Sequence, residues 1–157
     1  MQNSQTLQQQ MLLLLVACDD DKLLSEGVQE VFDDSTEVQK DFLKYMNEEI
    51  PSVESDEMEV LKLYSDAVGA DYVNDDVLQD TIEKEVLPAY TEFIAKIDAI
   101  KPKTDEVKDL HDVFYSAHKT QFTALEKVVV ALEKQDENLI NDANKLLEEG
   151  QIKIKKL

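Results

Sequence analysis

The stretch that decides the fold is residues 104–136, TDEVKDLHDVFYSAHKTQFTALEKVVVALEKQD. Its mainly apolar stripe recurs every three or four positions, the period of one face of an α-helix. The stripe consists of Val107, Leu110, Phe114, Ala117, Gln121, Leu125, Val128 and Leu132. Thr104 supplies an N-cap, and Asp105 and Glu106 place acids in the first turn, where the helix dipole favours them. The spacing predicts a helix of about 30 residues over 104–134.

The apolar spacing continues in phase beyond residue 136, so periodicity alone does not show whether the chain turns there. A single helix over 104–156 would be roughly 80 Å long, with nothing in the chain to cover its apolar end. We therefore predict a turn at 134–136, with Asp136 capping a further helix over 136–156.

Two more stripes with helical spacing lie upstream, over 36–68 and 75–100. Pro51 and Pro88 fall inside them, so we expect kinks near both positions. Gly69 is expected to be the C-cap of the first helix and Asn74 the N-cap of the second. No segment alternates with a period of two, and the fold class predicted is all-α: an antiparallel bundle of three long helices or four.

The net charge and the cysteine count exclude several classes of function. The chain has 157 residues, enough for one hydrophobic core, with 35 acidic residues, 16 lysines, no arginine and a formal charge of −19. This charge argues against a nucleic-acid partner, because phosphate binding requires clustered basic residues. A single cysteine excludes an internal disulfide and any metal site with two or four cysteines.

The negative charge is concentrated in the front half of the chain. Residues 19–76 carry a net charge of −15, whereas residues 77–157 carry −4. Such acids usually form the solvated faces of helices. The alternative is an acidic docking surface for a cationic partner, or for loosely bound divalent ions.

The amino terminus contains an uncharged, leucine-rich segment that ends at the single cysteine. The run Met11-Leu12-Leu13-Leu14-Leu15-Val16-Ala17 is too short to span a membrane but has the length of a secretory h-region. Leu15-Val16-Ala17-Cys18 resembles a bacterial lipobox, which implies removal of residues 1–17 and attachment of a diacylglycerol to Cys18. Residues 18–35 would then be an acidic tether, and residues 36–157 the helical bundle.

One feature departs from the lipobox pattern. Residues 1–10 contain no Lys or Arg, where a signal peptide carries a positive n-region. Either the natural chain starts elsewhere or the segment is not an export signal. In the second case residues 1–18 would form an ordinary amphipathic or buried helix, with Cys18 as a small core residue.

Short phrases at predicted helix boundaries carry a wider resemblance. They are Glu85-Val86-Leu87-Pro88-Ala89-Tyr90, Ile100-Lys101-Pro102-Lys103-Thr104, Leu110-His111, Ala131-Leu132-Glu133-Lys134-Gln135-Asp136 and Leu147-Glu148-Glu149-Gly150. They resemble small helical lipoproteins of Gram-positive bacteria, including the cell-wall-binding type, over less than half of the chain. The resemblance implies a helical fold and placement outside the cytoplasm, and it offers no catalytic residues.

No residue pattern for catalysis or metal binding is present in the sequence. His111 and His118 are seven residues apart, about 10 Å along a helix, which is too far for a shared metal ion. With Tyr115 and Gln121 they are expected to form a polar seam inside the bundle. We therefore expect no cofactor, no metal site and no enzymatic activity.

These observations predict a lipid-anchored protein on the outer face of the cytoplasmic membrane. Its contact with the membrane would be the lipid on Cys18, and its helical body would bind a cell-wall component or a protein partner. The alternative is a cytoplasmic acidic protein that binds or inhibits a partner through its charged surface.

Overall fold

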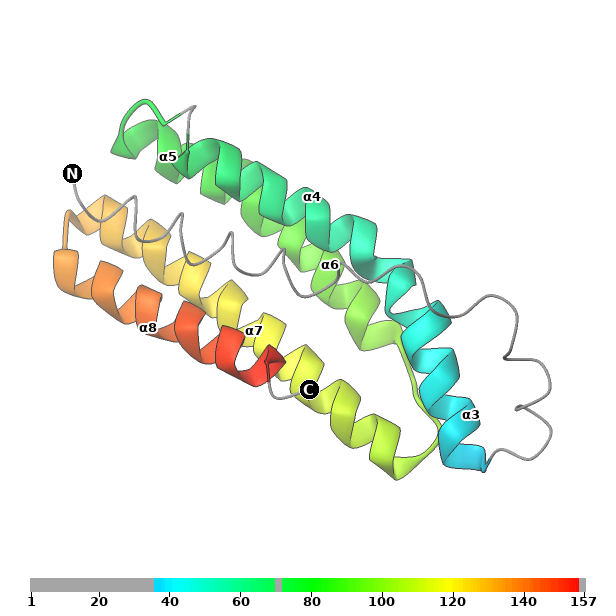
Figure 1. Cartoon of the computed structure of the whole chain (residues 1–157). Helices are drawn as coiled ribbons and strands as arrows, with labels where there is room; N and C mark the ends of the chain where they lie inside the picture. Colours follow the sequence, from blue (N-terminus) through cyan, green and yellow to red (C-terminus); the bar gives the residue numbers. More distant parts are fainter. Residues whose placement is uncertain (1–35, 70–71, 156–157) are drawn as a thin grey trace.

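The protein is an all-α bundle with four long helical stretches joined by short connections (Figure 1). The computed structural model describes residues 36–69 and 72–155, and these contain no β-strand. The elements are α3 (Glu37–Lys44), η3 (Tyr45–Glu49), α4 (Pro51–Val68), α5 (Asp75–Thr81), η4 (Ile82–Val86), α6 (Leu87–Ala99), α7 (Asp105–Lys134) and α8 (Glu137–Ile154). Elements α3 to α4 form one continuous helical stretch, and α5 to α6 form a second. Because the chain turns between α7 and α8, these two are separate helices, so the structure confirms the predicted bundle and has four long helices rather than three.

A π-helical turn ends two residues before each of the two helix prolines, Pro51 and Pro88. Ile50 N–H donates to Tyr45 O at 2.9 Å, and Leu87 N–H donates to Ile82 O, so both bonds span five residues. Pro51 is the first residue of α4 and Pro88 is the second residue of α6, positions where the missing N–H costs little stability. The wider turn gives the proline ring room that an α-turn would deny it. Figure 1 shows the axis changing direction between α3 and α4.

The core is formed mainly by the apolar stripes of three helical stretches, namely η3 to α4, α5 to α6, and α7. Its largest fully buried side chains include Tyr45, Tyr64, Phe93, Ile82, Ile97 and Leu125. Leu78, Ile82, Val86 and Tyr90 are all buried at intervals of four, although each such step in a straight α-helix drifts by about 40°. The π turn η4 lies within this run and takes up part of that drift.

Helices α7 and α8 form a closely packed antiparallel pair. Their contact face contains small residues seven apart: Ala117, Ala124 and Ala131 on α7, and Ala143 and Gly150 on α8, all buried. A Cβ atom at Gly150 would lie 2.7 Å from Gln121 Cγ and 3.1 Å from the Ala117 carbonyl oxygen. The small residues therefore set the distance between the two helices.

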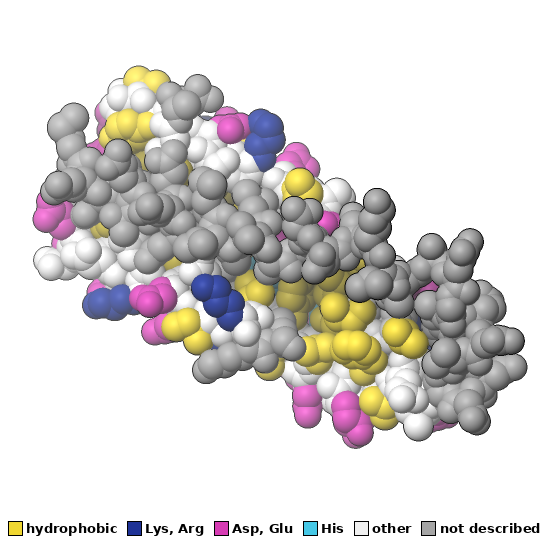
Figure 2. Space-filling view, in the orientation of Figure 1, with side chains coloured by type: hydrophobic (Ala, Val, Ile, Leu, Met, Phe, Trp, Pro, Cys, Tyr) yellow, Lys and Arg dark blue, Asp and Glu magenta, His cyan; other side chains and the backbone are white. Residues whose placement is uncertain are grey.

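Helix α8 covers only part of α7. Near its end, the Lys153 ammonium donates to the Ser116 and Thr120 hydroxyls at 3.0 and 2.9 Å. The part of α7 before Ser116 continues beyond α8, and apolar side chains are exposed there (Figure 2).

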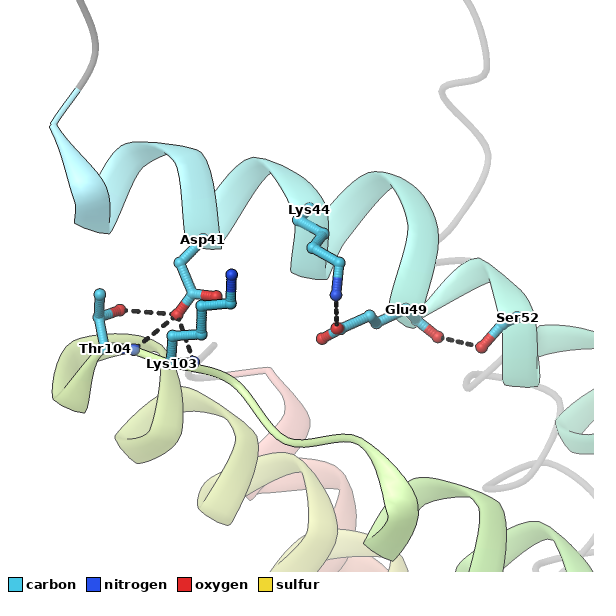
Figure 3. Close-up of polar contacts among 6 residues, drawn as sticks. All are labelled: Asp41, Lys44, Glu49, Ser52, Lys103 and Thr104. Carbon is cyan, nitrogen blue, oxygen red and sulfur yellow. Dashed lines mark hydrogen bonds and ion pairs between the residues drawn. The ribbon is translucent and has the colours of Figure 1, made fainter.

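Asp41 of α3 clamps the start of α7 (Figure 3). One oxygen of its buried carboxylate accepts hydrogen bonds of 2.8 Å from the Lys103 and Thr104 backbone N–H groups and from the Thr104 hydroxyl. Thr104 is the N-cap residue, as predicted, but its own hydroxyl makes no cap bond. The capping oxygen comes instead from a residue more than 60 positions earlier in the chain.

The remaining predicted helix ends lie close to their expected positions. Asn74 caps α5 by accepting from Val77 N–H, and Asp136 caps α8 by accepting from Asn138 N–H, both at 2.9 Å. Gly69 follows α4 at the C-cap position. The turn predicted at 134–136 is made by Gln135 in the left-handed conformation, with φ of 52°.

Candidate functional site

The predicted polar seam falls into two separate groups along α7. His111 Nδ1 lies 3.2 Å from the Tyr45 hydroxyl of η3. His118 Nδ1 lies 3.2 Å from the Tyr90 hydroxyl of α6, which also donates to Gln121 Oε1 at 2.8 Å. Tyr115 is partly buried and packs at the edge of the apolar core. The structure therefore brings His118 and Gln121 together, while His111 belongs to a second contact.

The hydrogen bond from Tyr90 to Gln121 favours one neutral form of His118. Because the single hydroxyl hydrogen of Tyr90 goes to Gln121, the hydrogen between Tyr90 and His118 has to come from His118 Nδ1. Nε2 then carries a lone pair. Burial among aromatic rings, with Phe114 and Phe93 at 4.5 and 4.9 Å between centroids, lowers the pKa of His118 to about 4. The imidazole is therefore neutral at neutral pH.

Glu57 of α4 faces His118 from the other side. Its Oε1 lies 3.9 Å from His118 Nε2, which is too long for a direct hydrogen bond. Burial, with a smaller contribution from the neighbouring charge of Glu54, raises the pKa of Glu57 to about 7. A protonated carboxyl is favoured here for a second reason, since an ionised one would face the lone pair of Nε2.

Buried Tyr90, His118 and Gln121 and partly buried Glu57 form a polar group inside the bundle, which we call the central polar cluster. Among the residues that the structure describes, His118 Nε2 and Gln121 Nε2 are buried and have no hydrogen-bond partner. Each such atom lowers the free energy of unfolding by about 1–3 kcal/mol when no water molecule hydrates it. Glu57 and His118 are 3.9 Å apart, too far to share a proton directly, and with pKa values of about 7 and about 4 the proton of the pair lies on Glu57. The chemistry available to this cluster is therefore to hold one proton on Glu57 below about pH 7.

Glu57 and Tyr90 are the members that sequence reasoning did not place in the site. Tyr90 lies on an apolar stripe and is buried with its hydroxyl bonded. Glu57 belongs to a polar run that interrupts the stripe of the first helix. The sequence did contain a signal that Glu57 faces the interior, because it lies on one helix face with the buried residues. Val53, Glu57, Val60 and Tyr64 follow the 4-3-4 spacing of that face.

The lipidation candidate Cys18, residues 1–17 and the acidic tether over 18–35 all lie outside the described residues. In the part of the chain that is described, no helix is both long enough and apolar enough to cross a membrane. Among the same residues, no group of three or more His, Asp or Glu side chains is arranged to hold a metal ion.

Comparison with known proteins adds no relative. No family model matches the chain, and neither any curated protein nor any solved structure matches it.

Proposed function

We propose that the protein is a non-enzymatic, lipid-anchored protein of a bacterial cell envelope, whose helical body binds an envelope component or a partner protein. The observation that carries the proposal is the segment Leu15-Val16-Ala17-Cys18 after a leucine run. Between that cysteine and the first described helix, which begins at Glu37, lie seven acids and one lysine. An anchor, a charged spacer and a folded body thus follow one another along the chain.

Physical chemistry supports this arrangement. A single acyl chain binds membranes only marginally, whereas the two chains of a diacylglyceryl group provide stable anchoring. A spacer of 18 residues has a mean reach of roughly 20–25 Å, and its negative charges repel one another and extend it further. Anionic lipid repels the same charges, and at physiological salt this repulsion decays over a Debye length of roughly 8 Å.

Detergent partitioning of the protein from its native cell tests the anchor. The parent chain is expected in the detergent phase, and Cys18→Ala in the aqueous phase. Ser25→Ala serves as the matched control, because it changes one small side chain in the spacer and is expected to leave partitioning unchanged. Equal partitioning of the parent and Cys18→Ala would overturn the proposal.

One observation favours a second function, that of a cytoplasmic acidic protein that binds or inhibits a partner. It is the net charge of −15 over residues 19–76, which suits an acidic docking surface. The mass of the chain isolated from its native cell separates the two functions, since an intact, unmodified amino terminus favours the cytoplasmic protein.

A further inference from the structure

The end of the bundle that carries α5 has a groove with an apolar floor and acidic rim. The groove, of about 200 Å³, lies between α4 and α5. Its lining consists of apolar Leu63, Ala67 and Leu78, which are buried or partly buried and form the floor, and of exposed Val77, Asp66 and Glu85, which form the rim. Val77 is 45% exposed although it is aliphatic. We call this feature the α5 groove.

Apolar exposure extends beyond the groove. Tyr72 and Val73, directly before α5, are 40% and 69% exposed. Figure 2 shows apolar side chains at this end of the molecule, with acidic side chains close by. Exposed large apolar side chains gathered at one place on a strongly charged protein indicate an interaction surface.

The charge around the α5 groove has one sign. A second hollow shares Val77 with the α5 groove, and a third hollow shares Asp76 and Gln79 with the second. The described residues that line the three hollows include six carboxylates and no lysine; the carboxylates are Asp66, Asp75, Asp76, Asp80, Glu85 and Glu133. Asp66 and Asp80 hold Lys62 and Lys84, whereas no ion pair among the described residues involves the other four.

We propose that the α5 groove binds a cationic amphipathic segment of a partner protein. The segment would place an aliphatic or aromatic side chain on the floor and Lys or Arg side chains against the rim. The acidic rim repels anionic lipid and a second copy of the same rim, so charge complementarity favours a basic peptide. This inference deepens the proposed function, because it gives the helical body a class of partner, but it does not depend on the lipid.

The test uses the full chain and a synthetic 14-residue amphipathic helix of leucine and lysine as the probe. Binding is followed by fluorescence anisotropy at 50 mM salt, and methyl NMR shifts locate the contact. A control peptide has serine in place of leucine at the same charge, and another has glutamate in place of lysine. The probe is expected to shift Leu63, Ala67 and Val77, and both controls to bind at least tenfold more weakly.

Variants separate the groove from general attraction to an acidic protein. Val77→Ser is expected to weaken binding by about fivefold, through loss of an apolar contact of about 1 kcal/mol. Glu85→Gln is expected to weaken it by about threefold at low salt and by less at 0.5 M salt. The matched controls are Val113→Ser, also at an exposed valine, and Glu148→Gln, also at an exposed acid, and both are expected to bind like the parent.

Several results would overturn the proposal. One is equal binding of the serine peptide, since it would show attraction to net charge alone. Others are NMR shifts confined to another surface, displacement of the probe by millimolar calcium that itself shifts the methyl groups of Val77, or self-association of the chain through the groove. Each of these leaves the lipid anchor untouched, because anchoring is measured separately by detergent partitioning.

Discussion

Glu57 and His118 face each other in the central polar cluster with opposite pKa shifts. Burial raises the pKa of Glu57 from 4.5 to about 7 and lowers that of His118 from 6.5 to about 4. Between pH 4.5 and 6.5 the unfolded chain therefore carries a proton on His118, whereas the folded chain carries one on Glu57. The pair as a whole exchanges almost no protons with solvent on unfolding, so its two pH effects cancel.

Single substitutions are expected to reveal the two pH dependences of the free energy of unfolding that cancel in the parent protein. In His118→Gln only the raised pKa of Glu57 remains, so the free energy of unfolding should rise as pH falls from about 7 to 4.5. In Glu57→Gln only the lowered pKa of His118 remains, so the free energy should fall as pH falls from 6.5 to about 4. Each slope is at most about 1.4 kcal/mol per pH unit.

Urea unfolding between pH 4 and 7.5 measures both slopes against the parent. Glu59→Gln is the control, because Glu59 is an exposed acid two positions from Glu57, and its profile should parallel that of the parent. Parallel profiles for all four proteins would mean that Glu57 and His118 titrate normally in the folded chain.

At the scale of single elements, the clamp between α3 and α7 depends on one carboxylate. Burial raises the pKa of Asp41, but hydrogen bonds from Thr104 and Lys103 outweigh it, and the net pKa is lowered from 3.8. The stabilisation is therefore present above pH 3.8 and is lost as pH falls through the lower pKa of the folded state.

Asp41→Ala is expected to reduce the free energy of unfolding by about 1.5–3 kcal/mol, because charge-assisted bonds to two backbone N–H groups are lost. Asp105→Asn removes an exposed acid in the first turn of α7, paired with Lys108 at 2.8 Å, and should destabilise the protein much less than Asp41→Ala. Chemical denaturation at pH 7 compares them. Similar losses in the two variants would show that Asp41 acts only through the helix dipole.

The contact between α7 and α8 gives a second expectation for elements. Alanine at position 150 would gain roughly 1 kcal/mol of helix propensity. Its Cβ would, however, press on Gln121 and on the backbone at Ala117, and overpacking of this kind costs about 1–3 kcal/mol. Gly150→Ala should therefore destabilise the protein by roughly 1 kcal/mol, and Gly150→Leu by considerably more.

Thermal unfolding of these variants checks the packing argument. Asn141→Ala, at an exposed position of α8, should be neutral or slightly stabilising because only helix propensity changes. A gain in stability for Gly150→Ala would contradict the close approach of the two helices.

Helix positions could be predicted from sequence because the apolar spacing, Asn74, Asp136 and the acids after Thr104 are all local signals. Three features could not. The π turns before Pro51 and Pro88 depend on how the proline ring fits into the preceding turn. Asp41 caps a helix more than 60 residues away, and Glu57 reaches His118 across the bundle. Contacts between distant segments leave no spacing pattern that would identify both partners.

At the scale of the whole molecule, electrostatic repulsion is spread unevenly. Residues 36–76 carry 12 acids and three lysines, whereas residues 77–157 carry 16 acids and 12 lysines. Raising salt screens repulsion over distances beyond about 8 Å. We therefore expect the melting temperature to increase between 10 and 300 mM sodium chloride.

Neutralising exposed acids should locate that repulsion. A variant with Glu48→Gln, Glu54→Gln and Glu59→Gln should lose more of the salt dependence than one with Glu106→Gln, Glu126→Gln and Glu149→Gln, which removes the same charge from the back half. Equal loss in the two variants would indicate that the charge distribution has no local effect on stability.

The central proposal is that a lipid attached to Cys18 anchors this helical body to the membrane. Intact mass spectrometry of the protein purified in detergent from its native membranes tests that claim most directly. The account predicts a chain that begins at Cys18 and carries the added mass of a diacylglyceryl group. A chain that retains residues 1–17 and has a free Cys18 thiol would contradict it.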